Sequence, residues 1–140
     1  MNKLKIIDLF CGSGGFTLGF LKEKFEVQLA IDHDPYCEQV YKKNLPTTNF
    51  ILQDLSQINK KIFLGLKPDV VVGGPPCQGF STIGSRISSI EKKREKKDIR
   101  NNLVFSFIEH VNYLNPKIFL MENVSGILTR DKGEIFHELT

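Results

Sequence analysis

Short apolar runs alternate with helix-like stretches along the whole of this 140-residue chain. The runs are rich in β-branched and aliphatic residues and show little polar alternation, which is typical of strands buried on both faces of a parallel sheet. The pattern therefore predicts an α/β fold built from βαβ units, in a length that fits one domain. The five predicted strands are 5–10, 27–31, 49–53, 69–73 and 117–121.

The segments between these strands predict the covering helices. Asp34 and Pro35 have the residue types of an N-cap and a first helical position, and Asn115-Pro116 ends a segment whose apolar residues recur at helical spacing. A helix that begins near residue 133 would need a partner for its apolar side chains. The predicted helices before it are 16–24, 35–44, 102–114 and, on a weaker pattern, 56–66.

Composition narrows the class of protein. Hydrophobic residues make up 41% and charged residues 25% of a chain with mean hydropathy -0.16, as in globular proteins. No apolar run is long enough for a membrane span or a signal peptide. The three cysteines are widely spaced and the three histidines are scattered, so neither disulfides nor a metal site is predicted. We expect a cytoplasmic protein.

Positive charge is concentrated in one segment. Residues 86–100 carry seven basic residues against three acidic ones, whereas the net charge of the whole chain is only +3. With few apolar residues to anchor it, 83–100 is predicted to be a mobile loop. A loop that faces phosphates is one interpretation, and an ordinary solvated charged loop is the other.

A glycine cluster, FCGSGGF at 10–16, separates the first predicted strand from the first helix. Glycines there let the backbone turn tightly and approach a ligand, and Asp32, about twenty residues beyond Gly12, has the position of a carboxylate that binds ribose. Asp54 and Leu55 follow the third strand, where they could meet an adenine amino group and its ring face. These features favour an adenosine ligand, although a plain βα turn and a capping Asp54 are alternatives.

A second cluster, GGPPCQGFS at 73–81, places Cys77 after a buried strand. Two prolines fix the backbone and the glycines leave the approach open, which favours a presented nucleophile over a cysteine buried in the core. Glu122 follows the fifth strand and should reach the same sheet edge. Because it emerges from an apolar run, we expect desolvation to raise its pKa and keep a proton available; a capping glutamate is the alternative.

Together these motifs resemble the C5-cytosine-specific DNA methyltransferases, which use S-adenosylmethionine. The order and spacing match along essentially the whole chain. The resemblance implies a Rossmann-like methyltransferase fold with a mostly parallel sheet, incomplete here at about five strands. The matching segments are DLFCGSGGF (8–16), Asp32, Asp54-Leu55, GPPCQ (74–78), DIRNNL (98–103) and ENV (122–124).

The resemblance also implies site residues. The catalytic set is Cys77, Glu122, Pro76 and Asn123. The cofactor set, for S-adenosylmethionine and its product S-adenosylhomocysteine without a metal, is Phe10, Gly12, Gly14, Gly15, Asp32, His33, Asp54, Leu55, Pro75 and Leu103. The loop that would face nucleic acid supplies Gln78, Ser81, Arg86, Lys92, Lys93, Arg94 and Arg100.

The implied reaction is methyl transfer to C5 of a cytosine flipped out of double-stranded DNA, as in restriction-modification systems. Cys77 would add to C6 and make C5 nucleophilic, while Glu122 would hold the N3 edge of the base.

The sequence departs from the family pattern after residue 124. An arginine-containing segment, a target-recognition domain and a segment that closes the cofactor pocket are not found. Residues 1–140 therefore correspond to the N-terminal part of the catalytic, cofactor-binding domain. We expect the isolated chain to be inactive or nearly so, and a second polypeptide to supply the C-terminal half.

Three other functions remain open. A related branch of the family methylates tRNA cytosines with the same cysteine and glutamate. A non-catalytic S-adenosylmethionine-binding remnant would fit the shortened chain, but leaves the Cys77 and Glu122 motifs without a use. A dinucleotide-dependent dehydrogenase leaves both residues unexplained.

Overall fold

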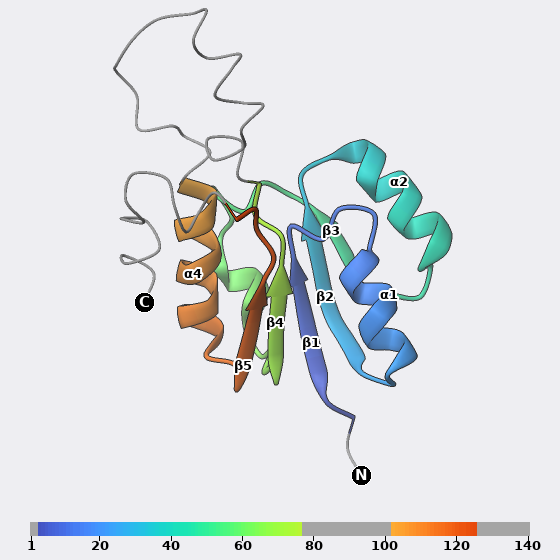
Figure 1. Cartoon of the computed structure of the whole chain (residues 1–140), viewed down its shortest axis with the longest axis horizontal. Helices are drawn as coiled ribbons and strands as arrows, with labels where there is room; N and C mark the ends of the chain where they lie inside the picture. The colour runs from blue at the N-terminus through green and yellow to red at the C-terminus, as the bar shows by residue number, and fades with distance from the viewer. Residues whose placement is uncertain (1–2, 77–101, 126–140) are drawn as a thin grey trace, which may run out of the picture.

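A parallel five-stranded sheet forms the centre of the computed structural model, which describes residues 3–76 and 102–125 (Figure 1). The strand order is β3-β2-β1-β4-β5, and every neighbouring pair is parallel. The predicted α/β fold is therefore confirmed. The strands are β1 (Lys5–Leu9), β2 (Glu26–Asp32), β3 (Phe50–Leu52), β4 (Val70–Gly73) and β5 (Ile118–Met121).

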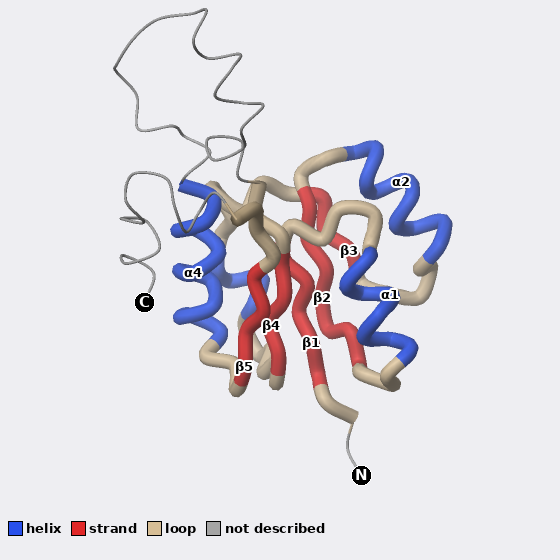
Figure 2. The backbone as a smooth tube through the Cα atoms, in the orientation of Figure 1, coloured by secondary structure: helices blue, strands red, loops and turns tan. Residues whose placement is uncertain are grey.

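Helices cover both faces of this sheet (Figure 2). One face carries α1 (Gly15–Lys22) and α2 (Pro35–Asn44), and the other carries the short 3-10 helix η1 (Lys60–Phe63) and α4 (Asn102–Leu114). The predicted bounds of α2 and α4 are confirmed. The Asp34 side chain accepts a hydrogen bond from the Tyr36 N–H at 2.8 Å, so it caps α2 as its residue type predicts.

The larger core lies between the sheet and α4. Alternate residues of β1 and β4 point to this side, and Ile7, Leu9 and Val71 are fully buried there against Phe107 and Phe63. Burial of each such side chain contributes about 2 kcal/mol. The smaller core, under α1 and α2, holds Cys11, Ala30, Tyr41, Leu45 and Phe50.

The predicted helix over 56–66 is wrong except for η1. The Asp54 carboxylate accepts hydrogen bonds from the N–H and the hydroxyl of Ser56, and the Asn59 side chain accepts from the Lys61 N–H. Such local bonds compete with helical ones, and Gly65, at φ 80, adopts a conformation that does not belong to a right-handed helix. The segment is therefore a series of turns.

Other boundaries differ by one or two residues. β1 ends at Leu9 because Phe10 turns to a φ of 57, and β2 is longer than predicted and includes Asp32. The predicted loop 83–100 and the predicted helix near residue 133 lie outside the described residues. Among the helices that the structure describes, none is long and apolar enough to cross a membrane.

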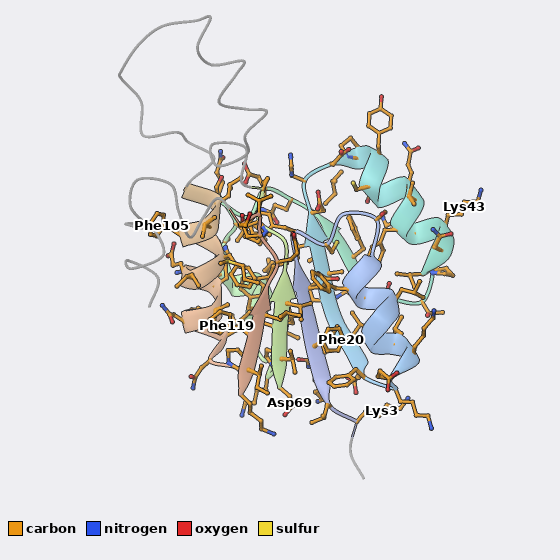
Figure 3. The ribbon with its side chains drawn as sticks, in the orientation of Figure 1. Lys3, Phe20, Lys43, Asp69, Phe105 and Phe119 are labelled. Carbon is orange, nitrogen blue, oxygen red and sulfur yellow. The ribbon has the colours of Figure 1, made fainter. Side chains whose placement is uncertain are left out.

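β5 forms one edge of the sheet and is the least covered strand. Phe119 faces α4, with its ring centroid 6.3 Å from that of Phe107 (Figure 3). Ile118 and Leu120 point to the opposite face, where they are 64% and 47% exposed. The described part of the chain thus leaves an apolar strip along this edge.

Candidate functional site

The predicted site residues gather at the carboxyl edge of the sheet. Parallel strands end at the same edge, and the strand order reverses between β1 and β4, where open α/β sheets bind their ligands. Asp69 and Lys3 mark the opposite edge (Figure 3). The residues at the carboxyl edge follow β1 (10–15), end β2 (Asp32), follow β3 (54–55), follow β4 (74–76) and follow β5 (122–123).

Asp32 holds the glycine turn that follows β1. One oxygen of its carboxylate accepts a hydrogen bond from the Gly12 N–H at 2.8 Å, and the other accepts from the Asp34 N–H at 3.0 Å. Gly14 has a φ of 96, and a Cβ there would lie 2.7 Å from Leu45 and 2.9 Å from Tyr41. A glycine is therefore required at position 14, because α2 packs directly against the turn.

The outer side of the same turn is open. A Cβ built on Gly12 or Gly15 meets nothing within 4 Å, so a ligand can approach this backbone closely. Each Asp32 oxygen keeps a lone pair beyond the bond that it already accepts, which leaves capacity for ribose hydroxyls. His33 is exposed, and its Nδ1 lies 3.5 Å from Asp32 Oδ1. These residues fit the ribose end of an adenosine cofactor.

Asp54 and Leu55 take different roles after β3. The Asp54 side chain is exposed, and the hydrogen bonds from Ser56 hold its pKa below the usual value, so it is a carboxylate at neutral pH. Leu55 is only 3% exposed and its side chain packs in the core. A ligand here would therefore meet the Leu55 backbone, because the side chain predicted to contact a ring face lies in the core.

The segments after β4 and β5 contact each other. The Glu122 N–H donates to the Gly73 carbonyl at 2.9 Å, and the Asn123 side-chain amide donates to the Pro75 carbonyl at 3.4 Å. A Cβ on Gly74 would lie 3.3 Å from Glu122 Oε2, which places that carboxylate beside the start of the Pro-Pro segment. Pro75 is buried and the following proline is half-buried.

The expected desolvation of Glu122 is not found in the described residues. Its side chain is exposed, because β5 is the edge strand and the apolar run before it is itself exposed on one face. An apolar sequence neighbourhood was a poor guide to the surroundings of this carboxylate.

Several predicted residues lie outside the described residues. They are Cys77 and the loop residues Gln78, Ser81, Arg86, Lys92, Lys93, Arg94 and Arg100. Leu103 is described, and it lies half-buried in the first turn of α4. Within 3–76 and 102–125 there is no group of three or more His, Cys, Asp or Glu side chains that could hold a metal ion.

Sequence reasoning missed a buried polar chain beside the glycine turn. Asp8 accepts hydrogen bonds from the N–H and the hydroxyl of Thr17, at 3.0 and 2.7 Å, and the Tyr41 hydroxyl donates to Thr17 Oγ1 at 3.0 Å. These hydrogen bonds link β1, α1 and α2 next to the glycine turn. An acidic residue in the middle of an apolar strand was the signal that could have found it.

Comparisons with known proteins agree with this arrangement. The family model described as C-5 cytosine-specific DNA methylase matches residues 4–140. The Type II methyltransferase M.DdeI of Desulfomicrobium norvegicum is 40% identical over 129 residues, which are 90% of this chain and 29% of that protein. The Type II methyltransferase M.AquIA of a Picosynechococcus strain is 37% identical over 93% of this chain and 52% of its own length.

Solved structures give the same result. A DNA modification methyltransferase encoded within an E. coli prophage superposes with a TM-score of 0.78 at 33% identity, covering 98% of this chain and 36% of its own. DNMT2 of Spodoptera frugiperda superposes with a TM-score of 0.70 at 26% identity, covering 98% and 40%. This chain thus spans about a third to a half of the length of these relatives.

Proposed function

Because the chain belongs to the C-5 cytosine-specific DNA methylase family, we propose that it carries the catalytic and cofactor-binding part of an enzyme that methylates C5 of cytosine in DNA. The observation that carries this proposal is the meeting of the Pro75 and Asn123 segments beside the open glycine turn. On this proposal the nucleophile motif, the Glu122 carboxylate and the adenosine site would share one sheet edge.

The cofactor pocket uses three strand ends. Asp32 would bind the ribose hydroxyls, Asp54 and the Leu55 backbone would meet the adenine, and the Gly12 to Gly15 turn would allow close approach of the remainder. Phe10, His33, Pro75 and Leu103 complete the proposed set. S-adenosylmethionine, when bound, supplies an electrophilic methyl group at this place.

The base would be activated by Cys77, which directly follows Pro76 in the chain. Its thiolate adds to C6 of cytosine, and the electron pair of the C5–C6 double bond becomes available at C5. Glu122 holds the N3 edge and gives a proton to N3 as negative charge develops. After C5 has gained the methyl group, it gives its proton to solvent, the C6–S bond breaks to release the thiolate, and N3 returns its proton to Glu122.

The DNA would be held by parts of the protein beyond the described residues. A cytosine in a duplex must be flipped out to reach this edge, and the basic loop residues between Gln78 and Arg100 are suited to contact the phosphates. Since the relatives are two to three times longer, we propose that methylation needs the region that corresponds to their remainder, whether in the same chain or in a second polypeptide.

Methyl transfer to nucleic acid tests the proposal. The protein would be incubated with tritiated S-adenosylmethionine and either mixed-sequence DNA or tRNA, with and without a polypeptide that supplies the C-terminal half of a relative. Cys77→Ala should abolish incorporation into DNA, whereas Cys37→Ala, a half-buried cysteine on α2, should retain it. Label that survives Cys77→Ala would contradict the proposed nucleophile.

The tRNA arm decides the second candidate function. The fold likeness extends to DNMT2 of Spodoptera frugiperda as well as to the prophage DNA methyltransferase, so the fold alone does not separate the two substrates. Label in tRNA and not in DNA would replace the DNA proposal. Binding of S-adenosylmethionine without transfer to either substrate would favour the non-catalytic remnant.

A further inference from the structure

One backbone carbonyl beside the proposed adenine site is held by two side chains of α4. The Ser106 hydroxyl donates to the Leu55 carbonyl at 3.0 Å, and His110 Nε2–H donates to the same oxygen at 2.8 Å. Both donors lie more than 50 residues from Leu55 in sequence. A long-range contact of this kind fixes where the backbone after Asp54 lies.

The segment that carries Asp54 has few other polar contacts, although its Leu55 and Ile58 side chains pack in the core. It lies between the end of β3 and η1, where the Asp54 carboxylate bonds to Ser56 of the same turn. The Gln53 N–H donates to the Asp32 carbonyl at 2.8 Å and ties the start of the segment to β2. The two hydrogen bonds from α4 are therefore the polar contacts that orient the backbone of this segment at Leu55.

Packing alone does not explain a histidine at position 110. Its ring is 2% exposed on the core face of α4, 5.5 Å from the Phe63 ring centroid. Its Nδ1 is buried without a hydrogen-bond partner among the described residues. Burial of an unpaired polar atom is unfavourable, and an apolar side chain would fill this position without that cost. The bond to the Leu55 carbonyl is the contact that only a polar residue provides.

We propose that Ser106 and His110 are positioning residues for the adenine end of the cofactor pocket. By holding the Leu55 carbonyl they place the Asp54 carboxylate and the Leu55 backbone so that these groups meet the 6-amino group of an adenine. The inference rests on the proposed cofactor site and deepens it, because it assigns purine discrimination to two residues that would not touch the ligand.

Discrimination between two purines is the direct test. S-adenosylhomocysteine carries the 6-amino group, whereas S-inosylhomocysteine carries an oxygen that the Asp54 carboxylate would repel. The dissociation constants of both ligands would be measured by titration calorimetry for the wild type and for Ser106→Ala, His110→Leu and His110→Gln. The glutamine keeps an N–H donor close to the place of Nε2.

The expected result is a selective loss. Ser106→Ala and His110→Leu should each weaken S-adenosylhomocysteine binding by about fivefold, the effect of one hydrogen bond, and affect the inosyl ligand less. His110→Gln should keep most of the preference for S-adenosylhomocysteine over the inosyl ligand. Glu109→Gln is the matched control on the same helix, since it removes an exposed pairing with Lys60 and leaves Leu55 untouched.

Different results would contradict the positioning role alone and the cofactor site on which it rests. If folded Ser106→Ala and His110→Leu both kept the wild-type affinities for the two ligands, and hence their ratio, the positioning role would be wrong and the cofactor site would stand. If His110→Leu does not fold, wild-type affinities in folded Ser106→Ala lead to the same conclusion. If the wild-type protein bound neither ligand, the proposed cofactor site would fall and the positioning role with it.

Discussion

Among the acidic residues that the structure describes, Asp8 is the most deeply buried. Its carboxyl group is fully buried in β1, and Oδ1 has no hydrogen-bond partner in the part of the chain that the structure describes. Desolvation raises the pKa of Asp8 to about 7, against the lowering effect of the Thr17 bonds, and the nearby charge of Asp32 adds to the rise.

This burial predicts a pH dependence of stability. The pKa of Asp8 is higher in the folded than in the unfolded chain, so its contribution is complete below the unfolded value of about 3.8 and is lost as pH rises through about 7. The free energy of unfolding should fall by about 2 to 3 kcal/mol between pH 5 and pH 8 from this group. Urea unfolding at both pH values measures it, and Asp8→Asn should show a much smaller difference. Equal differences for both proteins would contradict the prediction.

Glu122 offers a test at the reacting base. In a methylation-competent enzyme, Glu122→Gln removes the proton proposed for N3 and should lower kcat by about 10²-fold to 10⁴-fold. The dissociation constant for S-adenosylmethionine should stay unchanged, because Glu122 lies after β5, away from Asp32 and Asp54. Single-turnover label transfer and calorimetry measure the two quantities. Glu38→Gln, which changes a half-buried glutamate of α2 paired with Lys42, serves as the control.

At the scale of elements, sequence patterns predicted the strands and helix ends that depend on neighbouring residues alone. Mostly apolar runs marked all five strands, and the residue types at 34–35 and 115–116 bounded α2 and the end of α4. The helix over 56–66 failed because Asp54 and Asn59 bond to nearby backbone, a competition that apolar periodicity does not show.

The site also has features that the sequence predicted and features that it did not. Residues at strand ends could be placed at one edge from the sequence, since parallel strands share their direction. The burial of Leu55, the exposure of Glu122 and the two donors from α4 depend on which elements pack together, so no local pattern contains them. The positions beyond the described residues, Cys77 among them, stay predictions.

Because β1 and β4 approach each other closely, a methyl group added at Gly73 should destabilise the fold. A Cβ on Gly73 would lie 2.2 Å from the Leu9 carbonyl oxygen and 2.8 Å from the Phe107 ring. Gly73→Ala should therefore lower the free energy of unfolding by at least about 2 kcal/mol. In Gly19→Ala, where nothing lies within 4 Å of the added Cβ in α1, stability should rise by about 0.5 to 1 kcal/mol. Denaturant titration of both variants checks the contrast, and equal effects would contradict it.

For the whole molecule, the apolar strip on β5 should govern solubility more than stability. Ile118 and Leu120 contact solvent on the face opposite α4, and β5 pairs with β4 alone among the described strands. Open edges with apolar side chains favour association between chains.

A charge placed in that strip tests this view. Ile118→Lys should change the free energy of unfolding of the described domain by less than about 0.5 kcal/mol, because the side chain is already 64% exposed. Light scattering at increasing protein concentration should show less association than in the wild type. A large loss of stability would mean that Ile118 is covered in solution.

The position of β1 in the strand order also bears on how the chain acquires its structure during synthesis. β1 can pair with β2 soon after both emerge, but its other edge must wait for β4, and the Lys5 N–H meets the Asp69 carboxylate across a separation of 64 residues. Contacts so distant in sequence slow folding. Until residue 73 has left the ribosome, the strand that precedes the glycine turn is paired on one edge only, so the ligand edge cannot form before β4 has been made.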